Sequence, residues 1–247
     1  MNIVIAMPTF NEAKTIGRMC DTLFKDVFPK IKNHKMMLLV MDDMSPDGTW
    51  KIVENKKKKY KNLYLSLGRE QKGGLGAAYI RGFSYAIATL KADAIMEMDA
   101  DFQHDPFDVP RFVAEFDKGY DYILGSRYVT NGSIPKEWSL DRKFFSVVGN
   151  LIYQIGLLMF DVHDFTTGFR LARVKGFLDS MNFARVFSKS FVYKTRLLYE
   201  MKKRGAKVKE IPIVFGLRIT GDSKMPTNNV FESLKVIAVI WKDRLSS

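Results

Sequence analysis

The sequence contains almost no cysteine. Cys20 is the single cysteine among its 247 residues, so an internal disulfide cannot form and a reducing compartment is favoured. Cys20 shares an apolar stripe of helical spacing with Ile16, Met19, Leu23 and Val27. This position predicts a thiol buried in the core rather than a reactive thiol.

A long hydrophobic run is also missing. The nearest candidate, Phe144–Phe160, is interrupted by Asn150 and Gln154 and falls short of the ~20 predominantly apolar residues that a membrane span needs. The residues after Met1 are typical of a buried strand and lack the basic start of a signal peptide. We therefore expect a soluble or peripheral protein.

Acidic residues are outnumbered by basic ones, 27 against 39, which gives a formal net charge of +12. This excess of positive charge suits an anionic partner. The three candidates are a nucleic acid, a phosphorylated substrate and an acidic membrane surface. Nucleic acid is the least supported of the three, because the chain has no recognition motif and its acidic loops would repel phosphates without a metal. We expect no nucleic-acid partner.

No repeat or low-complexity linker divides the chain, and we expect one domain over residues 1–247. Up to residue 130, short apolar runs alternate with segments of helical periodicity. This alternation predicts an α/β fold with a mostly parallel central sheet and flanking helices. The expected strands are Ile3–Met7, Met36–Met41, Leu63–Leu67, Ala94–Met98 and Tyr122–Leu124, and the expected helices are Ala13–Phe28, one from Thr49, Leu75–Leu90 and Val109–Lys118.

The pattern changes after residue 130. Residues 138–185 are rich in aromatic residues and glycine without clean alternation, so no strand is predicted there. Farther along, the pattern predicts a helix at Phe191–Arg204, a strand at Lys207–Val214, a polar loop at 220–229 and an amphipathic segment at Val230–Trp241.

Polar and acidic residues follow three of the predicted strands. The first strand leads into Pro8–Glu12, the second into Asp42–Gly48 and the fourth into Asp99–His104. Each stretch alone is also typical of a turn or a helix cap. Ligands of open parallel sheets bind beyond the carboxyl ends of the strands, so three such stretches at one edge indicate a binding site.

The Asp99–His104 stretch is the most specific of the three. Alternate residues of an extended chain point the same way, so Asp99, Asp101 and Gln103 are expected to converge on one hard cation. Their oxygens suit Mg²⁺ or Mn²⁺, which takes substrate phosphates as further ligands. Such a site fits a nucleotide diphosphate-sugar donor, whose diphosphate leaves more easily on a metal. His104 is a candidate fourth ligand, but a ring that stacks within the turn is the favoured interpretation.

A glycine-rich stretch, Lys72–Gly76, precedes the third predicted helix. Glycines let the backbone approach a diphosphate, and Lys72 and the helix N-terminus add positive potential. The spacing matches neither the dinucleotide fingerprint nor the P-loop. A plain entry loop explains this stretch equally well.

Together these stretches resemble the inverting GT-A glycosyltransferases of family 2, over nearly the whole chain. Further motifs narrow the resemblance to dolichyl-phosphate mannose synthases. These motifs are Gly125–Tyr128, Gly168–Arg170 and Gly221–Met225.

The resemblance implies a metal-dependent hexosyltransferase that moves mannose from GDP-mannose to a polyprenyl (dolichyl) phosphate. It implies a GT-A (Rossmann-like) domain in which residues 1–130 bind the nucleotide sugar and residues 131–247 bind the acceptor. The implied donor-binding residues are Pro8, Phe10, Glu12, Met41, Asp43, Lys72, Asp99, Ala100 and Asp101. The implied residues for the acceptor phosphate are Arg127, Arg142, Ser146 and Lys224.

The same resemblance assigns Mg²⁺ or Mn²⁺ to Asp101 and Gln103. Its implied catalytic residues are Asp99, Asp101, Arg127 and Arg218, with Arg218 and Lys224 on a loop that closes over both substrates. Phe10 departs from the family, which commonly has tyrosine at this position, so we expect a ring stack on the donor without a hydroxyl contact.

Membrane attachment is a second departure, because many relatives carry C-terminal membrane spans. Phe144–Phe160, flanked by Arg142 and Lys143, is expected either to lie in the membrane interface, with Leu157 and Phe160 toward lipid, or to form a core helix. The expected location is the cytoplasmic face of a membrane. A small membrane-anchoring subunit is a candidate partner.

An acceptor phosphate needs no general base, because its second pKa is ~6 and it is anionic at neutral pH. Asp164 stands where hydroxyl-using relatives place a base, and we expect it to have an orienting role, together with Arg170. Two alternatives remain open. One is a UDP-glucose-dependent polyprenyl-phosphate glucosyltransferase, and the other is a non-catalytic GT-A binding subunit.

Overall fold

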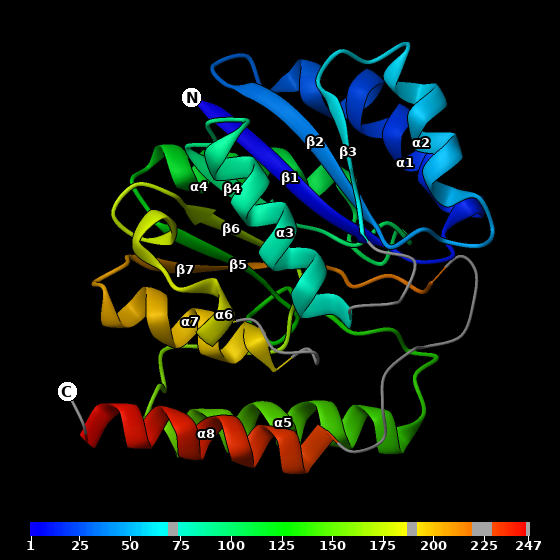
Figure 1. The fold of residues 1–247 in the computed structure, drawn as a ribbon. Helices are drawn as coiled ribbons and strands as arrows, with labels where there is room; N and C mark the ends of the chain where they lie inside the picture. Colours follow the sequence, from blue (N-terminus) through cyan, green and yellow to red (C-terminus); the bar gives the residue numbers. More distant parts are fainter. Residues whose placement is uncertain (69–73, 187–191, 219–228, 246–247) are drawn as a thin grey trace.

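The computed structural model describes residues 1–68, 74–186, 192–218 and 229–245. It confirms the α/β class, with one sheet of strand order β3-β2-β1-β4-β6-β5-β7 (Figure 1). The strands are β1 (Asn2–Thr9), β2 (Lys35–Asp42), β3 (Leu63–Leu67), β4 (Ala94–Glu97), β5 (Tyr122–Ser126), β6 (Arg170–Arg173) and β7 (Val208–Pro212).

Strand β6 runs against the other described strands. It pairs antiparallel with both β4 and β5, whereas the remaining pairs of the sheet are parallel. No strand was expected there, because β6 has four residues, two of them arginines, and this is too short for a periodic signal. Strands β6 and β7 join the sheet formed by the earlier part of the chain, so the two expected halves share it.

Helices follow the strands much as the sequence predicts. A π-helical turn (Leu23–Val27) and a 3₁₀ turn (Phe28–Lys30) continue the first helix, and further 3₁₀ turns lie at Pro106–Asp108 and Leu178–Ser180. The α-helices are α1 (Ala13–Thr22), α2 (Thr49–Lys57), α3 (Gly74–Ala88), α4 (Val109–Asp117), α5 (Leu140–Leu157), α6 (Phe183–Val186), α7 (Tyr193–Lys203) and α8 (Asn229–Leu245).

Strands β1, β2 and β4 are buried on both faces of the sheet, which explains why they are apolar at nearly every position. Successive residues of β1 point to opposite faces. Ile3 and Ile5 pack in a core with residues of α1 and α4, and Val4 and Ala6 pack in a second core with residues of α3 and α7. Cys20 is fully buried in the first core, as expected, and burial raises the pKa of its thiol to about 12.

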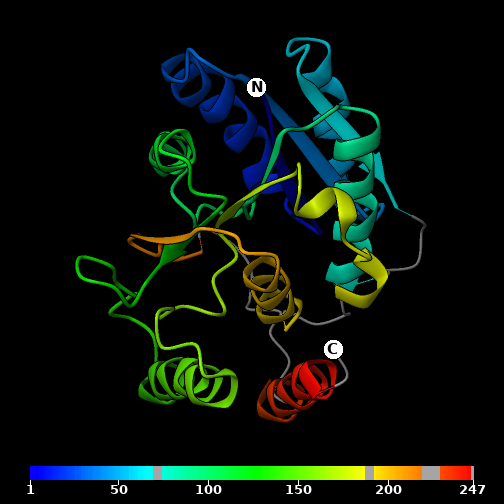
Figure 2. The same ribbon diagram turned by 90° about the vertical axis from the view of Figure 1, so that its left-hand side faces the viewer.

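Helices α5 and α8 lie side by side as an outer layer below the sheet (Figures 1 and 2). The hydroxyl of Tyr153 donates to Ser233 Oγ at 2.6 Å, and the indole of Trp241 donates to the carbonyl of Gly156 at 2.6 Å. Leu157 is fully buried, so the expectation that it faces lipid is wrong. Phe160 is exposed, as expected.

The outer faces of both helices carry exposed apolar side chains. These are Leu140, Phe144, Phe145, Val147, Leu151 and Ile155 on α5, and Leu234, Val239, Trp241 and Leu245 on α8. Within the described residues, no helix is both long and apolar enough to cross a membrane.

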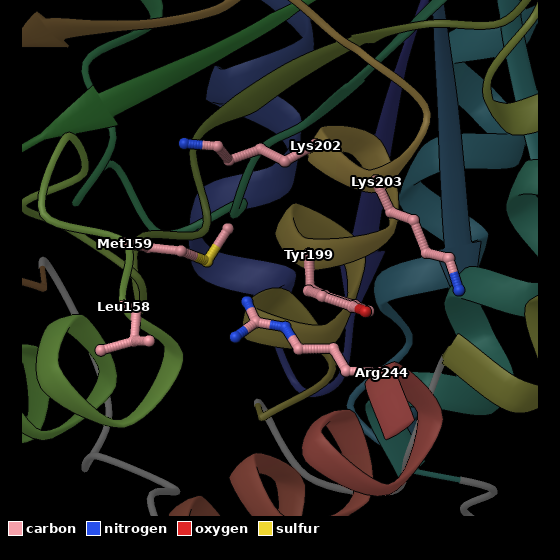
Figure 3. Close-up of a pocket in the computed structure, with 6 residues that line it drawn as sticks. All are labelled: Leu158, Met159, Tyr199, Lys202, Lys203 and Arg244. Atoms are coloured by element: carbon pink, nitrogen blue, oxygen red, sulfur yellow. The ribbon is translucent and has the colours of Figure 1, made fainter. Parts of the chain in front are cut away.

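A cavity of about 430 Å³ lies between the C-terminal ends of α5, α7 and α8 (Figure 3). Figure 3 shows the guanidinium of Arg244 pointing toward Met159 and the ammonium of Lys203 pointing away from it. Arg244 donates to the carbonyl of Leu157 at 2.8 Å, and Lys202 and Lys203 stand in the last turn of α7. Cations at helix C-termini balance the helix dipole, which accounts for the basic lining.

Candidate active site

The loops after β1 and β2 are tied together by Asp42. Its carboxylate is fully buried and accepts hydrogen bonds from Thr9 Oγ1 and from the backbone and hydroxyl of Ser45, each at 2.7 Å. Ser45 Oγ in turn accepts from the amide of Asn11 at 3.0 Å. Asp42 therefore builds the edge of the site and leaves the neighbouring Asp43 for other contacts.

Asp43 is held by helix α3. Arg81 Nη2 donates to Asp43 Oδ1 at 2.7 Å, and a methyl group at Gly68 would lie only 2.0 Å from the same oxygen. The close approach of the Gly68 backbone fixes where the carboxylate lies. Arg81 and Gly68 thus hold the Asp43 carboxylate in one position.

The other expected nucleoside-binding residues differ in accessibility. Pro8 and Phe10 are half-buried at the end of β1, and Glu12 is buried and accepts from Thr15 Oγ1 at 3.1 Å. The side chain of Met41 is fully buried, and a methyl group at Gly82 would lie 1.8 Å from its sulfur. Any contact from Met41 to a donor would therefore come from its backbone.

The acidic loop after β4 is not extended. The expectation that Asp99, Asp101 and Gln103 converge because alternate residues of an extended chain point the same way is therefore wrong. Asp101 Oδ1 accepts from the amide of Gln103 at 3.0 Å, and Phe102 between them has a φ of +64°. The side chain of Gln103 donates to the carbonyl of Gly216 at 3.3 Å. The loop is thus a tight turn, covered by the chain that follows β7, and Ala100 is buried within it.

Asp101 has the surroundings of a metal ligand. No hydrogen bond of the described residues reaches Asp101 Oδ2, and Arg218 Nε lies 2.8 Å from it as an ion pair. Burial and the negative charge of Asp99 raise the pKa of Asp101, so a divalent cation at this oxygen would relieve an electrostatic cost. The donor set of Asp101 and Gln103 fits Mg²⁺ or Mn²⁺.

The protein part of this ligand set is small. Within the described residues, no group of three or more histidine, cysteine, aspartate or glutamate side chains is arranged to hold a metal. A cation on Asp101 and Gln103 would complete its shell with water and substrate phosphates, which is the usual mode for Mg²⁺.

His104 has the structural role that was favoured for it. Its ring stacks on Phe169 at 4.9 Å between centroids, and its Nδ1 accepts from the amide of Asp99 at 3.1 Å. Burial lowers the pKa of His104 to about 3. His104 is therefore neutral and shapes the acidic loop.

Arg127 and Asp164 form a buried two-point ion pair. Arg127 Nε and Nη2 donate to the two oxygens of Asp164 at 2.7 Å each, and Nη2 also donates to Thr166 Oγ1 at 2.7 Å. Burial acts to raise the pKa of Asp164, but the charge and hydrogen bonds of Arg127 outweigh it and hold the pKa below its usual range. A guanidinium has five N–H donors, and the two on Nη1 make no hydrogen bond to the described residues.

Asp164 holds the guanidinium of Arg127, and no hydrogen bond joins it to the expected Arg170 within the described residues. Arg170 is fully buried and donates to the carbonyls of Phe165, Thr167 and Lys194. The sequence could not show which of the two arginines bonds to Asp164, because the contact with Arg127 joins segments that are 37 residues apart in the chain.

Three expected arginines meet near the acidic loop. The pKa of Arg142 is lowered by burial and by the positive charges of Arg127 and Arg218, so the three charges act on one another. Arg142 stacks on Trp138 at 3.9 Å, and Arg127 lies 5.4 Å from the ring centroid of Phe215. The rings of Trp138 and Phe215 lie 5.8 Å apart, and guanidinium groups gathered in this way are suited to bind an anion.

Ser146 lies one helical turn after Arg142 on α5 and adds a hydroxyl group on the same side of the helix. Its Oγ hydrogen-bonds the hydroxyl of Tyr128, the residue after Arg127. Ser146 therefore lies beside the arginine group, as the resemblance implied. Two expected residues, Lys72 and Lys224, fall outside the described residues.

Lys194 was missed by the sequence analysis. Helix α7 carries it, its side chain is buried, and Nζ donates to the carbonyl of Thr166 at 3.4 Å. In the sequence, Lys194 is only a lysine on an otherwise apolar face of a helix, and a lysine at such a position is more often solvated. Its place beside His104 depends on the packing of α7 against the segment that contains Thr166 and Gly168.

These observations define a class of protein. A mostly parallel α/β sheet, an acidic turn after β4 and an arginine group opposite it belong to the GT-A glycosyltransferases. The structure superposes on glucosyl-3-phosphoglycerate synthase from Mycobacterium tuberculosis, solved with Mn²⁺, uridine diphosphate and glucosyl-3-phosphoglycerate. The TM-score is 0.63 at 16% identity, over 98% of this chain and 79% of that chain, which shows a common fold.

The chain belongs to glycosyl transferase family 2, whose model matches residues 4–179. It is 31% identical over 235 residues to polyprenol monophosphomannose synthase from Mycolicibacterium smegmatis, covering 95% of this chain and 85% of the relative. It is 30% identical over 243 residues to dolichol-phosphate mannosyltransferase from Pyrococcus furiosus, covering 98% of this chain and 64% of that relative. The chain thus spans less than two thirds of the Pyrococcus protein.

Proposed function

We propose that the chain transfers mannose from GDP-mannose to the phosphate of a polyprenyl lipid. The observation that carries the proposal is the group of Arg127, Arg142 and Arg218, whose charges act on one another beside the acidic turn. An enzyme that joins a diphosphate donor to a phosphate acceptor must hold two anions together. The names of the two relatives support mannose as the sugar and a polyprenyl phosphate as the acceptor.

The acceptor phosphate binds to the arginine group in this proposal. Arg127 offers Nη1 while Asp164 fixes the rest of its guanidinium. Arg142 supplies a second fork of donors, and Ser146 a hydroxyl. Bidentate contacts of this kind suit phosphate oxygens.

The donor lies across the ends of β1, β2 and β4. Asp43, held by Arg81, contacts the nucleoside, and Asp99 contacts the donor sugar. Mg²⁺ or Mn²⁺ bound by Asp101 and Gln103 would neutralise the diphosphate and make it a better leaving group. An oxygen of the acceptor phosphate attacks the anomeric carbon from the opposite side, so the configuration inverts and the nucleoside diphosphate leaves.

No side chain is needed to remove a proton from the acceptor in this mechanism. A phosphate monoester carries a charge of about −1.5 to −2 at neutral pH. Asp164 is already bonded by Arg127 through both oxygens, which suits an orienting group better than a proton acceptor.

The exposed apolar faces of α5 and α8 support contact with the membrane that holds the acceptor. Phe144 and Ile155 are 62% and 57% exposed, and Arg142 and Lys143 stand at the N-terminal end of the same helix. Apolar side chains beside cations are typical of segments that lie in the interface of an anionic bilayer. We infer a peripheral position on the cytoplasmic face, with or without a small anchoring subunit.

A radiolabel transfer assay tests the proposal. GDP-mannose and UDP-glucose are offered in parallel, with dolichyl phosphate in detergent and Mn²⁺, and with Asp101→Ala and a chelator as controls. Metal-dependent entry of mannose into the lipid phase, absent in both controls, is the expected result. Label from UDP-glucose alone would establish the glucosyltransferase alternative. Intact nucleotide binding without transfer from either donor would favour the non-catalytic subunit.

A further inference from the structure

Lys194 is a buried cation to which the proposed mechanism assigns no role. Its ammonium has three N–H donors, and the one hydrogen bond that the described residues offer it is 3.4 Å long, to Thr166. A buried charge with so little compensation is costly. Burial accordingly lowers the pKa of Lys194, while the nearby carboxylates act in the opposite direction.

The ammonium lies against the main chain under the acidic turn. A methyl group built at Gly168 would come within 2.7 Å of Lys194 Nζ and within 3.3 Å of His104 Cε1. The ring of His104 in turn receives the amide of Asp99 at 3.1 Å, and its Nδ1 lies 3.8 Å from Asp99 Oδ2. Lys194 therefore lies close to Gly168 and the ring of His104, and the same ring contacts Asp99.

Asp99 is the natural partner of this cation. The charged groups that act on Lys194 are Asp99, Arg170, Glu97 and Arg127. Three of these have other partners: Glu97 accepts from Tyr193 at 2.6 Å, Arg127 is bonded to Asp164, and Arg170 donates to carbonyl oxygens. The carboxylate of Asp99 accepts no hydrogen bond from the described residues, and of the attractive charges on Lys194 it acts most strongly.

We propose that Lys194 is a positioning residue that holds the Asp99 carboxylate against the donor sugar. The inference rests on the proposed function, in which Asp99 contacts the sugar of the nucleotide donor. Lys194 then acts on the sugar half of the donor and leaves the nucleoside diphosphate half unaffected, because Asp43, on the loop after β2, and the metal site at Asp101 hold that half. Gly168 is required because any side chain there would push the ammonium away.

The test compares the affinity for the complete donor with the affinity for its nucleotide alone. For the wild type and for Lys194→Gln, calorimetry measures the Kd of GDP-mannose and of GDP with Mn²⁺ present. We expect the Kd of GDP-mannose to rise about tenfold or more, because the Asp99 carboxylate loses a compensating charge, while the Kd of GDP changes less than about twofold.

Two further variants distinguish a specific effect on sugar binding from a general loss of folding. Gly168→Ala keeps the lysine but displaces its ammonium, and the same selective loss of sugar affinity is expected. Lys202→Gln makes the same charge change at the solvent end of α7 and should bind both ligands as the wild type does. Parallel weakening of GDP and GDP-mannose in Lys194→Gln and in Gly168→Ala would overturn the proposal, because it would show a merely structural lysine.

The prediction that GDP-mannose is the donor can be wrong without affecting the role proposed for Lys194. If the wild type prefers UDP-glucose, the same ratio is measured with UDP-glucose and UDP, and only the variant-to-wild-type comparison decides the role of Lys194. Unchanged sugar affinity in both variants would reject that role, whichever donor the enzyme uses.

Discussion

Arg127 binds Asp164 through two parallel hydrogen bonds of 2.7 Å, and the carboxylate is completely buried. The pair joins the end of β5 to the loop before β6. Because removal of one partner from a buried pair leaves a charge without compensation, this contact fixes the direction in which Arg127 presents its remaining donors.

The substitution Asp164→Asn tests this relationship. It keeps the shape of the side chain but removes the charge, so Arg127 should lose its fixed orientation. We expect the kcat/KM for polyprenyl phosphate to fall about 10- to 100-fold, the equivalent of about 1.4–2.8 kcal/mol, with an unchanged Kd for the nucleotide. Steady-state kinetics and calorimetry measure the two quantities.

Asp161→Asn is the control for that substitution, because Asp161 is an exposed carboxylate three residues earlier that pairs with Lys202. It should leave both quantities unchanged. Complete loss of transfer by Asp164→Asn with intact donor binding would contradict the orienting role and favour a general base.

The substitution Gly68→Ala is expected to weaken donor binding. Its methyl group would lie 2.0 Å from Asp43 Oδ1 and 3.0 Å from the Arg81 guanidinium, so the carboxylate must leave its position. We expect the Kd of the nucleotide to rise about tenfold, near the 1.4 kcal/mol of one lost charged contact. Titration calorimetry with the nucleoside diphosphate measures it.

Gly149→Ala provides the matched change for this test. A methyl group at Gly149, on α5, meets no atom within 4 Å. Alanine has the higher helix propensity, so this variant should be equally or more stable, by up to about 1 kcal/mol, and bind nucleotide normally. Equal nucleotide affinity in both alanine variants would show that Asp43 does not contact the donor.

The stabilising effect of Asp21 should depend on pH. Hydrogen bonds from Lys56 and Tyr60 lower the pKa of Asp21 from 3.8 to about 2. Between these values the unfolded state binds more protons than the folded state, so the contribution is complete above pH ~4 and disappears as the pH falls toward 2. At neutral pH we expect Asp21→Asn to cost at most about 1 kcal/mol, because the pair is partly solvated.

Urea unfolding of the wild type and Asp21→Asn from pH 7 down to pH 2 measures this effect. The difference between the two free energies of unfolding should shrink with acidification and with added salt, which screens exposed pairs. A difference that stays constant down to pH 2 would contradict the assigned pKa.

The exposed face of α5 should control membrane binding. Leu151 and Ile155 are 49% and 57% exposed on one side of the helix, so glutamate at both positions adds charge to this exposed surface without opening the core. We expect vesicle co-sedimentation to fall at least about tenfold, because placing charge at a bilayer interface removes apolar burial.

Phe107→Glu makes a similar change on an exposed aromatic ring away from α5 and α8, and it should sediment as the wild type does. The transfer activity of all variants in detergent separates membrane binding from catalysis. Full vesicle binding by the Leu151→Glu/Ile155→Glu variant would reject the interfacial position of α5.

Local pattern predicted most of the fold. The runs that became β1 and β2 are apolar at nearly every position, because both faces of a parallel strand are covered. Strand β6 escaped prediction because its pairing is long-range, between β4 and β5, and its four residues include a fully buried arginine. The sequence could not indicate that Arg170 has carbonyl oxygens around it.

The character of the site could be predicted, but its contacts could not. The acidic turn was expected because a polar stretch after a strand marks the edge of a parallel sheet, and Arg127, Arg142 and Arg218 were implied by the family resemblance. Which arginine pairs with Asp164, and that Lys194 is buried beside His104, depends on segments about 40 to 90 residues apart along the chain.

The sequence by itself determined the family, the order of strands and helices, and the chemical character of the site, because these follow from local periodicity and contiguous motifs. Only the tertiary structure decided that Leu157 faces the core while Leu151 faces outward, that Arg127 is bonded to Asp164, and that Lys194 is buried close to Gly168 and His104. Burial and charge pairing depend on neighbours that are distant in the chain, and local pattern carries no information about them.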